Sequence, residues 1–177
     1  MRQLALLILA LATTPAALAG ECRTALRPLL LSTQPEATAL QAVRALCQKE
    51  ADAGDPVAGY ELALFHLGLG GEWQPQAAIP LMRDAATAGV SEAQYWLAWQ
   101  YEEGPLLDHD PALALSWYQR AANANHRLAV ARLARAYEAG ELGLARNPLK
   151  AAEYKAREAQ CLRRQQAGLA PQAAPGS

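Results

Sequence analysis

This sequence has no excess of charge of one sign, because its 177 residues include 16 Lys and Arg and 17 Asp and Glu. A protein that binds nucleic acid neutralises a run of phosphates with a basic patch, and the sequence contains no such patch. After the first 19 residues, no apolar run approaches the roughly 20 residues that a helix needs to span a bilayer. We therefore expect no nucleic-acid partner and no membrane span in the mature chain.

Residues that bind metals or carry catalysis are also scarce. The three histidines are His66, His109 and His126. They lack the i, i+4 spacing and the nearby Cys or carboxylate set of a metal site. The glycine run at 68–71 lacks the Lys-Ser/Thr of a phosphate loop, and no histidine is placed to activate Cys161. We expect no metal, no cofactor and no catalytic residue, and we assign Glu102 and Glu103 to a solvated helix end.

The first 19 residues have the organisation of a secretory signal peptide. Arg2 supplies a positive start, an apolar segment follows at residues 4–12, and Ala17-Leu18-Ala19 fits the small-x-small rule of signal peptidase. The apolar segment is too short to anchor the chain in a membrane. We predict cleavage before Gly20 and export of the mature protein.

Cysteine is rare, and all three cysteines follow the predicted cleavage site. Disulfides form in oxidising compartments. Cys22 would begin the first helix and Cys47 would lie late in the second, so an antiparallel hairpin would bring these two within bridging distance. We predict a Cys22–Cys47 disulfide, with Cys161 as the free thiol. The alternative is that all three cysteines stay reduced.

One pattern occurs three times between Ala58 and Gln160. Its copies begin at Ala58, Ala93 and Ala129, which are 35 and then 36 residues apart. Each copy reads Ala-x-x-x-Leu-Ala, and the second and third continue to Tyr-x-x-Gly. A fixed period of this length indicates a stacked array of helical repeats.

Prolines and capping residues indicate where the helices begin. In Asp55-Pro56, Asp110-Pro111 and Asn147-Pro148, a capping side chain precedes a proline at the first helical position. A proline also begins the helix after Gln74, and Ser91 is expected to cap the helix that follows it. These signals divide the chain into a cleaved signal peptide (1–19), an N-terminal capping helix pair (20–54), three repeats in 55–162 (about 55–89, 90–125 and 126–162) and a disordered tail (163–177).

The repeated residues resemble the Sel-1-like repeat (SLR), a close relative of the tetratricopeptide repeat. The second copy matches that family's pattern at Ala93, Leu97, Tyr101, Gly104, Asp110, Ala114, Trp117, Tyr118, Ala121 and Ala122. The first copy is the weakest, with His66 at the tyrosine position. The resemblance implies an all-α fold, an α/α superhelix or solenoid of antiparallel helix pairs. It also implies protein–protein interaction, often as a secreted or envelope adaptor in bacteria, and no catalytic residues.

The resemblance further implies that the first helix of each pair lines the concave face. Away from the packing positions, these helices carry Tyr60, Tyr95, Trp99 and Arg135, which are residue types enriched at binding hot spots. The sequence leaves open whether Tyr95 and Trp99 form a groove or pack against neighbouring helices.

We therefore predict a periplasmic or secreted bacterial adaptor that binds a protein or peptide on its concave helix surface without catalysis. Two alternatives stay open. One is an assembly or structural subunit of an envelope or secretion complex. The other is a cell-wall-active or β-lactam-binding enzyme of the cysteine-rich repeat type, although the S-x-x-K motif of serine β-lactamases is absent from the sequence.

Overall fold

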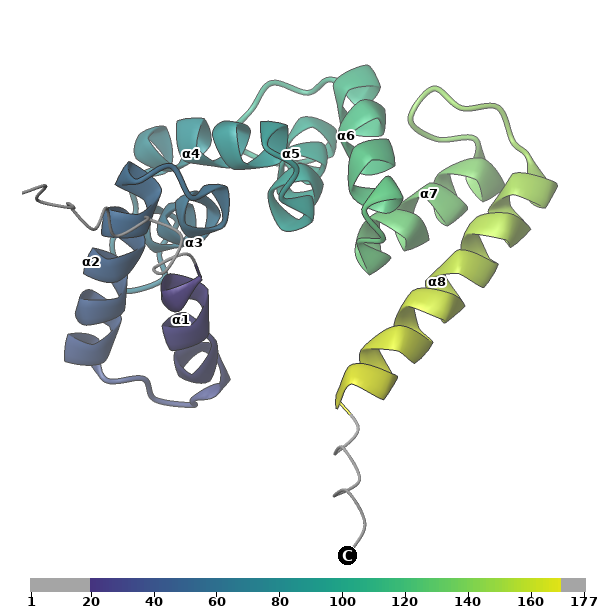
Figure 1. The fold of residues 1–177 in the computed structure, drawn as a ribbon. Coiled ribbons are helices and arrows are strands. Elements are labelled where there is room, and N and C mark those ends of the chain that lie inside the picture. Colours follow the sequence, from purple (N-terminus) through teal and green to yellow (C-terminus); the bar gives the residue numbers. More distant parts are fainter. Residues whose placement is uncertain (1–19, 170–177) are drawn as a thin grey trace, which may run out of the picture.

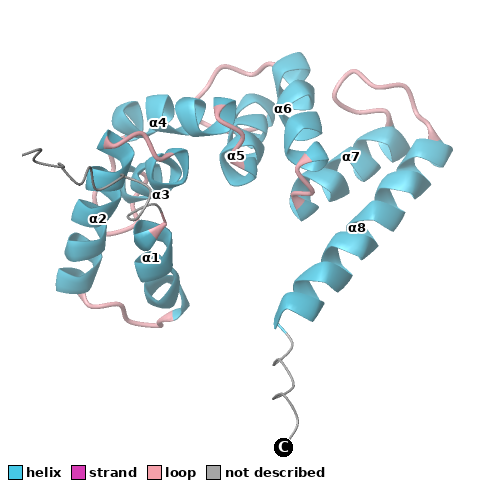
Figure 2. Ribbon diagram, in the orientation of Figure 1, coloured by secondary structure: helices cyan, strands magenta, loops and turns pink. Residues whose placement is uncertain are grey.

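The computed structural model describes residues 20–169, so the predicted signal peptide and residues 170–177 lie outside the described residues. The described range forms eight helices and no named strand (Figure 2). The helices are α1 (Glu21–Leu31), α2 (Ala37–Asp52), α3 (Pro56–His66), α4 (Pro75–Thr87), α5 (Ser91–Glu102), α6 (Pro111–Asn123), α7 (Arg127–Ala139) and α8 (Pro148–Leu169).

The helices follow one another as an arch, with α1 and α2 at one end and α8 at the other (Figure 1). Each helix packs extensively against the next one in the chain, and α1 also contacts α3. Stacking of successive helices in this way produces a solenoid. The predicted all-α superhelix is confirmed. Among the described helices, none is both long enough and apolar enough to cross a bilayer.

The repeated alanines and leucines form the core. Nine of them are no more than 2% exposed: Ala58, Leu62 and Ala63 in α3, Ala93, Leu97 and Ala98 in α5, and Ala129, Leu133 and Ala134 in α7. The small alanine side chains let neighbouring helices approach closely, and the leucines fill the space between them. The spacing of the pattern is therefore explained by packing.

Most helix starts agree with the capping signals. The Asp55 side chain accepts a hydrogen bond from the Val57 amide at 2.8 Å, and Asp110 caps α6 in the same way. The prediction for Ser91 is wrong, because the N-cap of α5 is the extended residue Val90. Ser91 is already the first helical residue, and its hydroxyl donates to the Glu92 carboxylate instead of accepting from a backbone amide.

The predicted disulfide is present and joins α1 to α2. Cys22 and Cys47 are both 0% exposed, and they are separated by 25 residues in the sequence. Cys161 is a buried free thiol on α8, with its Sγ 3.6 Å from the carbonyl oxygen of Asn125.

The predicted disordered tail is wrong for residues 163–169, because α8 continues to Leu169. Residues 162–167 are Leu, Arg, Gln and Ala, which all have high helix propensity. The low content of large apolar residues that predicted a tail does not prevent a helix that is already nucleated from continuing.

Candidate binding surface

A cavity of about 750 Å³ lies over α5, α6 and α7. Its lining comprises Tyr95, Trp99 and Glu102 of α5, Glu103 and His109 of the following loop, Pro111 and Tyr118 of α6, Arg132 and Arg135 of α7, and Glu141 and Leu142 of the loop after α7. Three of the four predicted partner-binding residues, Tyr95, Trp99 and Arg135, therefore line one cavity. It contains charged groups of both signs beside aromatic rings.

Trp99 and Arg135 are the accessible members of this group. Trp99 is 40% exposed although it is large and apolar, and Arg135 of α7 is also exposed. An indole ring offers broad apolar contact at low entropic cost, while a guanidinium binds carboxylates and aromatic faces. These two side chains are available to a ligand without rearrangement of the core.

Tyr95 packs against other side chains of the protein. Its ring stacks on His126 with a centroid distance of 4.6 Å and an interplanar angle of 24°. It also lies 5.8 Å from the Tyr118 ring. Tyr95 is half-buried between these rings, so it supports the cavity wall as well as lining it.

Tyr60 lies in a second cavity of about 370 Å³, which is lined by residues of α1, α3 and the start of α5. Burial, followed by the nearby carboxylates of Glu61 and Glu92, raises the pKa of Tyr60 to about 12. The four predicted residues are thus divided between two cavities. Tyr60 does not share the cavity of Trp99.

A buried polar network forms the floor of the larger cavity. Glu102, at the end of α5, accepts a hydrogen bond from the Tyr118 hydroxyl at 2.7 Å and from the Arg132 Nε at 2.9 Å. The Arg132 Nη2 also contacts Glu102, and its Nη1 lies 2.7 Å from a Glu141 carboxylate oxygen. The assignment of Glu102 to a solvated helix end is wrong, because this side chain is only 9% exposed.

The network favours the ionised form of Glu102 and the neutral form of Tyr118. Burial alone would raise the pKa of Glu102, but hydrogen bonds from Arg132 and Tyr118 outweigh it and hold the pKa below its usual range. Burial and the Glu102 carboxylate raise the pKa of Tyr118. Sequence reasoning missed this network because Arg132 and Glu102 are 30 residues apart, and the alanine-leucine pattern carries no signal for such a pair.

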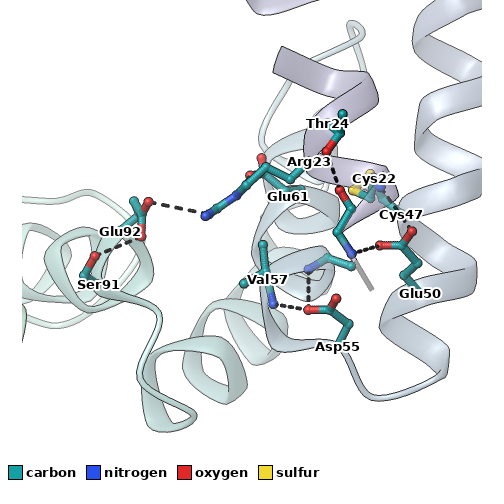
Figure 3. A network of polar contacts seen from close by, with 12 residues as sticks. Cys22, Arg23, Thr24, Cys47, Glu50, Asp55, Val57, Glu61, Ser91 and Glu92 are labelled. Atoms are coloured by element: carbon teal, nitrogen blue, oxygen red, sulfur yellow. Dashed lines mark hydrogen bonds and ion pairs between the residues drawn. A yellow bond between two sulfur atoms is a disulfide. The ribbon is translucent and has the colours of Figure 1, made fainter. Parts of the chain in front are cut away.

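A second polar network connects the N-terminal helices (Figure 3). Arg23 of α1 donates to Glu61 of α3 at 3.0 Å and to Glu92 of α5 at 3.5 Å. Burial raises the pKa of Glu61, although the Arg23 guanidinium opposes that shift. Arg23 thereby connects three helices and borders the cavity that contains Tyr60.

His126 should make the stability of the fold depend on pH. Burial lowers the pKa of His126; Arg127 adds to the shift and Glu92 opposes it. The lowered pKa favours the neutral ring, whose Nδ1 accepts from the Ala129 amide at 3.4 Å. A histidine whose pKa is lowered by folding stabilises the folded state at pH values above its unfolded-state pKa of about 6.5. That stabilisation is lost as the pH falls through the folded-state pKa. We expect the free energy of unfolding to decrease between pH 7.5 and 5.5.

The variant His126→Asn tests this prediction, because Asn keeps a capping oxygen but does not titrate. Urea unfolding at several pH values should show a smaller decrease for this variant than for the unmodified protein. His66→Asn is the matched control, since the His66 ring is bonded only to Gln74 at the surface and should leave the profile unchanged. Equal slopes for His126→Asn and the unmodified protein would contradict the prediction.

Comparisons with known proteins agree with this architecture. The family model of the Sel1 repeat matches residues 91–126 and 127–154, which contain α5, α6, α7 and the start of α8. The chain is also similar to the crystal structure of a Sel1 repeat protein from Oxalobacter formigenes, with 36% sequence identity and a TM-score of 0.60. That match covers 68% of this chain and 94% of the Oxalobacter chain. The chain belongs to the Sel1 repeat family.

A second similar structure is a protective antigen of uropathogenic Escherichia coli strains that displays an SLR fold. It is 27% identical, with a TM-score of 0.59, and the match covers 67% of this chain but 26% of the antigen. No curated protein matches the chain. Sel1 repeats generally mediate protein interactions, and Sel1 repeat proteins are typically non-catalytic scaffolds. This Sel1 repeat protein therefore has the architecture of a protein-interaction scaffold.

Proposed function

We propose that this Sel1 repeat protein is an exported, non-catalytic adaptor that binds a protein segment or peptide in the cavity over α5, α6 and α7. The observation that carries the proposal is the pair Trp99 and Arg135, which are both accessible and line the same cavity of about 750 Å³. The Glu102–Arg132 contacts hold the floor beneath them.

The chemistry of the cavity favours a ligand with an apolar or aromatic side chain between charged groups. Trp99 offers an apolar surface, Arg135 a cation, and Glu103 an exposed carboxylate. Because the floor is buried and internally paired, ligand binding requires little ordering of the protein, which favours affinity. An extended peptide of mixed charge fits these properties.

We further propose the organisation that would support this role. In it, α1 and α2 form an N-terminal cap, α3 and α4 form a divergent first repeat, and the chain is cleaved before Gly20 on export to the periplasm or beyond. The same Ala/Leu burial in α3 as in α5 and α7 supports the first repeat. The Cys22–Cys47 disulfide supports an oxidising compartment, where such bonds persist.

Site-specific photocrosslinking in intact cells tests the binding surface. A photoreactive phenylalanine analogue is placed at Trp99 or Arg135 in the full chain. We expect both positions to capture the same protein. Trp99→Ala should weaken the capture made from position 135 by about tenfold or more, as expected for a hot-spot residue.

The chain offers a matched control in Trp73, which is 61% exposed between α3 and α4 and does not line the cavity. The analogue at Trp73 should not capture the protein that positions 99 and 135 capture. Trp73→Ala should leave capture from position 135 unchanged. Tyr95→Ala is unsuitable as a probe, because it removes packing on His126 and Tyr118. Equal capture from positions 73 and 99 would contradict the proposed binding surface. It would instead support a structural subunit that contacts other proteins on several faces.

A further inference from the structure

Glu50 is a deeply buried carboxylate at the start of α1. Its residue is only 3% exposed, although it belongs to the surface helix α2. One carboxylate oxygen accepts from the Cys22 amide at 3.1 Å and the other from the Gly20 nitrogen at 3.3 Å. Figure 3 shows Glu50 beside the Cys22–Cys47 disulfide, one helical turn after Cys47.

Within the part of the chain that the structure describes, Glu50 differs from the other buried glutamates in having no paired cation. Glu61 is paired with Arg23, and Glu102 is paired with Arg132. Within residues 20–169, no Lys, Arg or His forms an ion pair with Glu50, although it is the most buried of the three. A buried carboxylate without a counter-charge is costly, so a positive group at this position would remove a defect of the fold.

We propose that cleavage of the Ala19–Gly20 peptide bond supplies the missing cation, and that Glu50 is the receptor for the new α-ammonium group. This inference rests on the proposed export, and it is independent of the binding cavity. Hydrolysis by a signal-peptidase-type endopeptidase adds one water molecule to the bond. The Ala19 carbonyl carbon becomes a carboxylate, the Gly20 nitrogen is released as an amine, and that amine takes up the remaining proton to become ammonium.

The geometry already matches this product. The nitrogen that would carry the charge is the one that lies 3.3 Å from the Glu50 carboxylate. Cleavage would replace the neutral amide donor of Gly20 with a charged ammonium donor, and neither Gly20 nor Glu50 would need to move. The Glu50 carboxylate already makes this hydrogen bond a charge-assisted one. An ammonium donor would add a direct attraction between opposite charges, which water screens little at a buried site. The disulfide fixes the relative position of α1 and α2, so the ion pair forms in a prearranged site. Processing therefore completes the N-terminal part of the fold.

A cycle of four proteins tests the ion pair. Two begin at Gly20, prepared from a fusion that leaves this residue as the first, and two retain Ala17-Leu18-Ala19, so that the Gly20 nitrogen is an ordinary amide. Each length is made with Glu50 and with Glu50→Gln. We expect Glu50→Gln to raise the unfolding equilibrium constant roughly tenfold more in the protein that begins at Gly20, because only there does it break a buried ion pair.

Glu21→Gln is the matched control, since Glu21 is an exposed carboxylate in the first turn of α1 and should have the same effect at both lengths. If Glu50→Gln prevents folding, the two lengths with Glu50 are compared directly, and the protein that begins at Gly20 should be the more stable. Equal stability of the two lengths, or an equal effect of Glu50→Gln in both, would overturn the proposal.

The position of cleavage is tested separately, by intact-mass measurement of the exported protein. A chain that begins at Gly20 supports the proposal, and one that begins at any other residue overturns it. Failure of photocrosslinking at Trp99 and Arg135 would reject the binding surface and leave these two measurements unaffected.

Discussion

Replacing Arg132 with Met should lower the free energy of unfolding by about 3–5 kcal/mol, because it leaves the buried Glu102 carboxylate without its cation. Arg132 is 12% exposed and Glu102 is 9% exposed, so solvent screens the lost interaction very little. The three helices α5, α6 and α7 meet at this network through Glu102, Tyr118 and Arg132. Chemical denaturation followed by circular dichroism measures the change.

A double-mutant cycle separates the loss of the pair from general damage. Glu102→Gln combined with Arg132→Met should cost clearly less than the sum of the two single changes, because the double variant leaves no unpaired buried charge, and Glu141 is half exposed. Lys155→Met is the matched control, since the Lys155–Glu138 pair is about half exposed and should contribute less than about 1 kcal/mol. If Arg132→Met were as mild as Lys155→Met, the network would not hold the cavity floor.

The second large effect is expected for the disulfide. Replacing Cys22 and Cys47 together with alanine should lower the free energy of unfolding by about 3 kcal/mol, as expected for a loop of this length. The loss should be concentrated in α1, which the disulfide holds against α2. Hydrogen exchange of the α1 amides should therefore increase more than exchange in α5 to α7.

Reduction provides an independent check of the same bond. A thiol reductant should destabilise the unmodified protein and leave the double alanine variant unchanged. Cys161→Ala is the control for the loss of a buried thiol without loss of a bond, and it should retain sensitivity to the reductant. A reductant that has no effect on the unmodified protein would show that the Cys22–Cys47 bond does not contribute to stability.

The sequence predicted the parts of the fold that depend on local order. The alanine-leucine spacing identified buried faces such as Ala93 and Leu97, because a helix places residues four apart on the same side. Asp55 and Asp110 were identified as caps, because capping depends on residues within one turn. The disulfide was predictable because adjacent antiparallel helices bring Cys22 and Cys47 together.

The predictions that were wrong concern a contact between helices far apart in the sequence and the exact residue at which a helix begins. Glu102 was assigned to solvent because its partner Arg132 comes from a helix two elements later. Ser91 was expected to be a cap, but the chain enters the helix one residue earlier, at the buried residue Val90. Tyr60 of α3 and Trp99 of α5 line different cavities, because the cavity of Trp99 is formed with the helices that follow α5 and the cavity of Tyr60 with α1.

The packing of each helix against its sequence neighbours has a consequence for how the chain acquires its structure. Among the eight helices of residues 20–169, every extensive contact joins successive helices except the one between α1 and α3. A chain with such low contact order closes only short loops as it folds, so it should fold rapidly. Each pair of helices can dock as soon as its own segment is available, and the array can then grow from that nucleus in either direction.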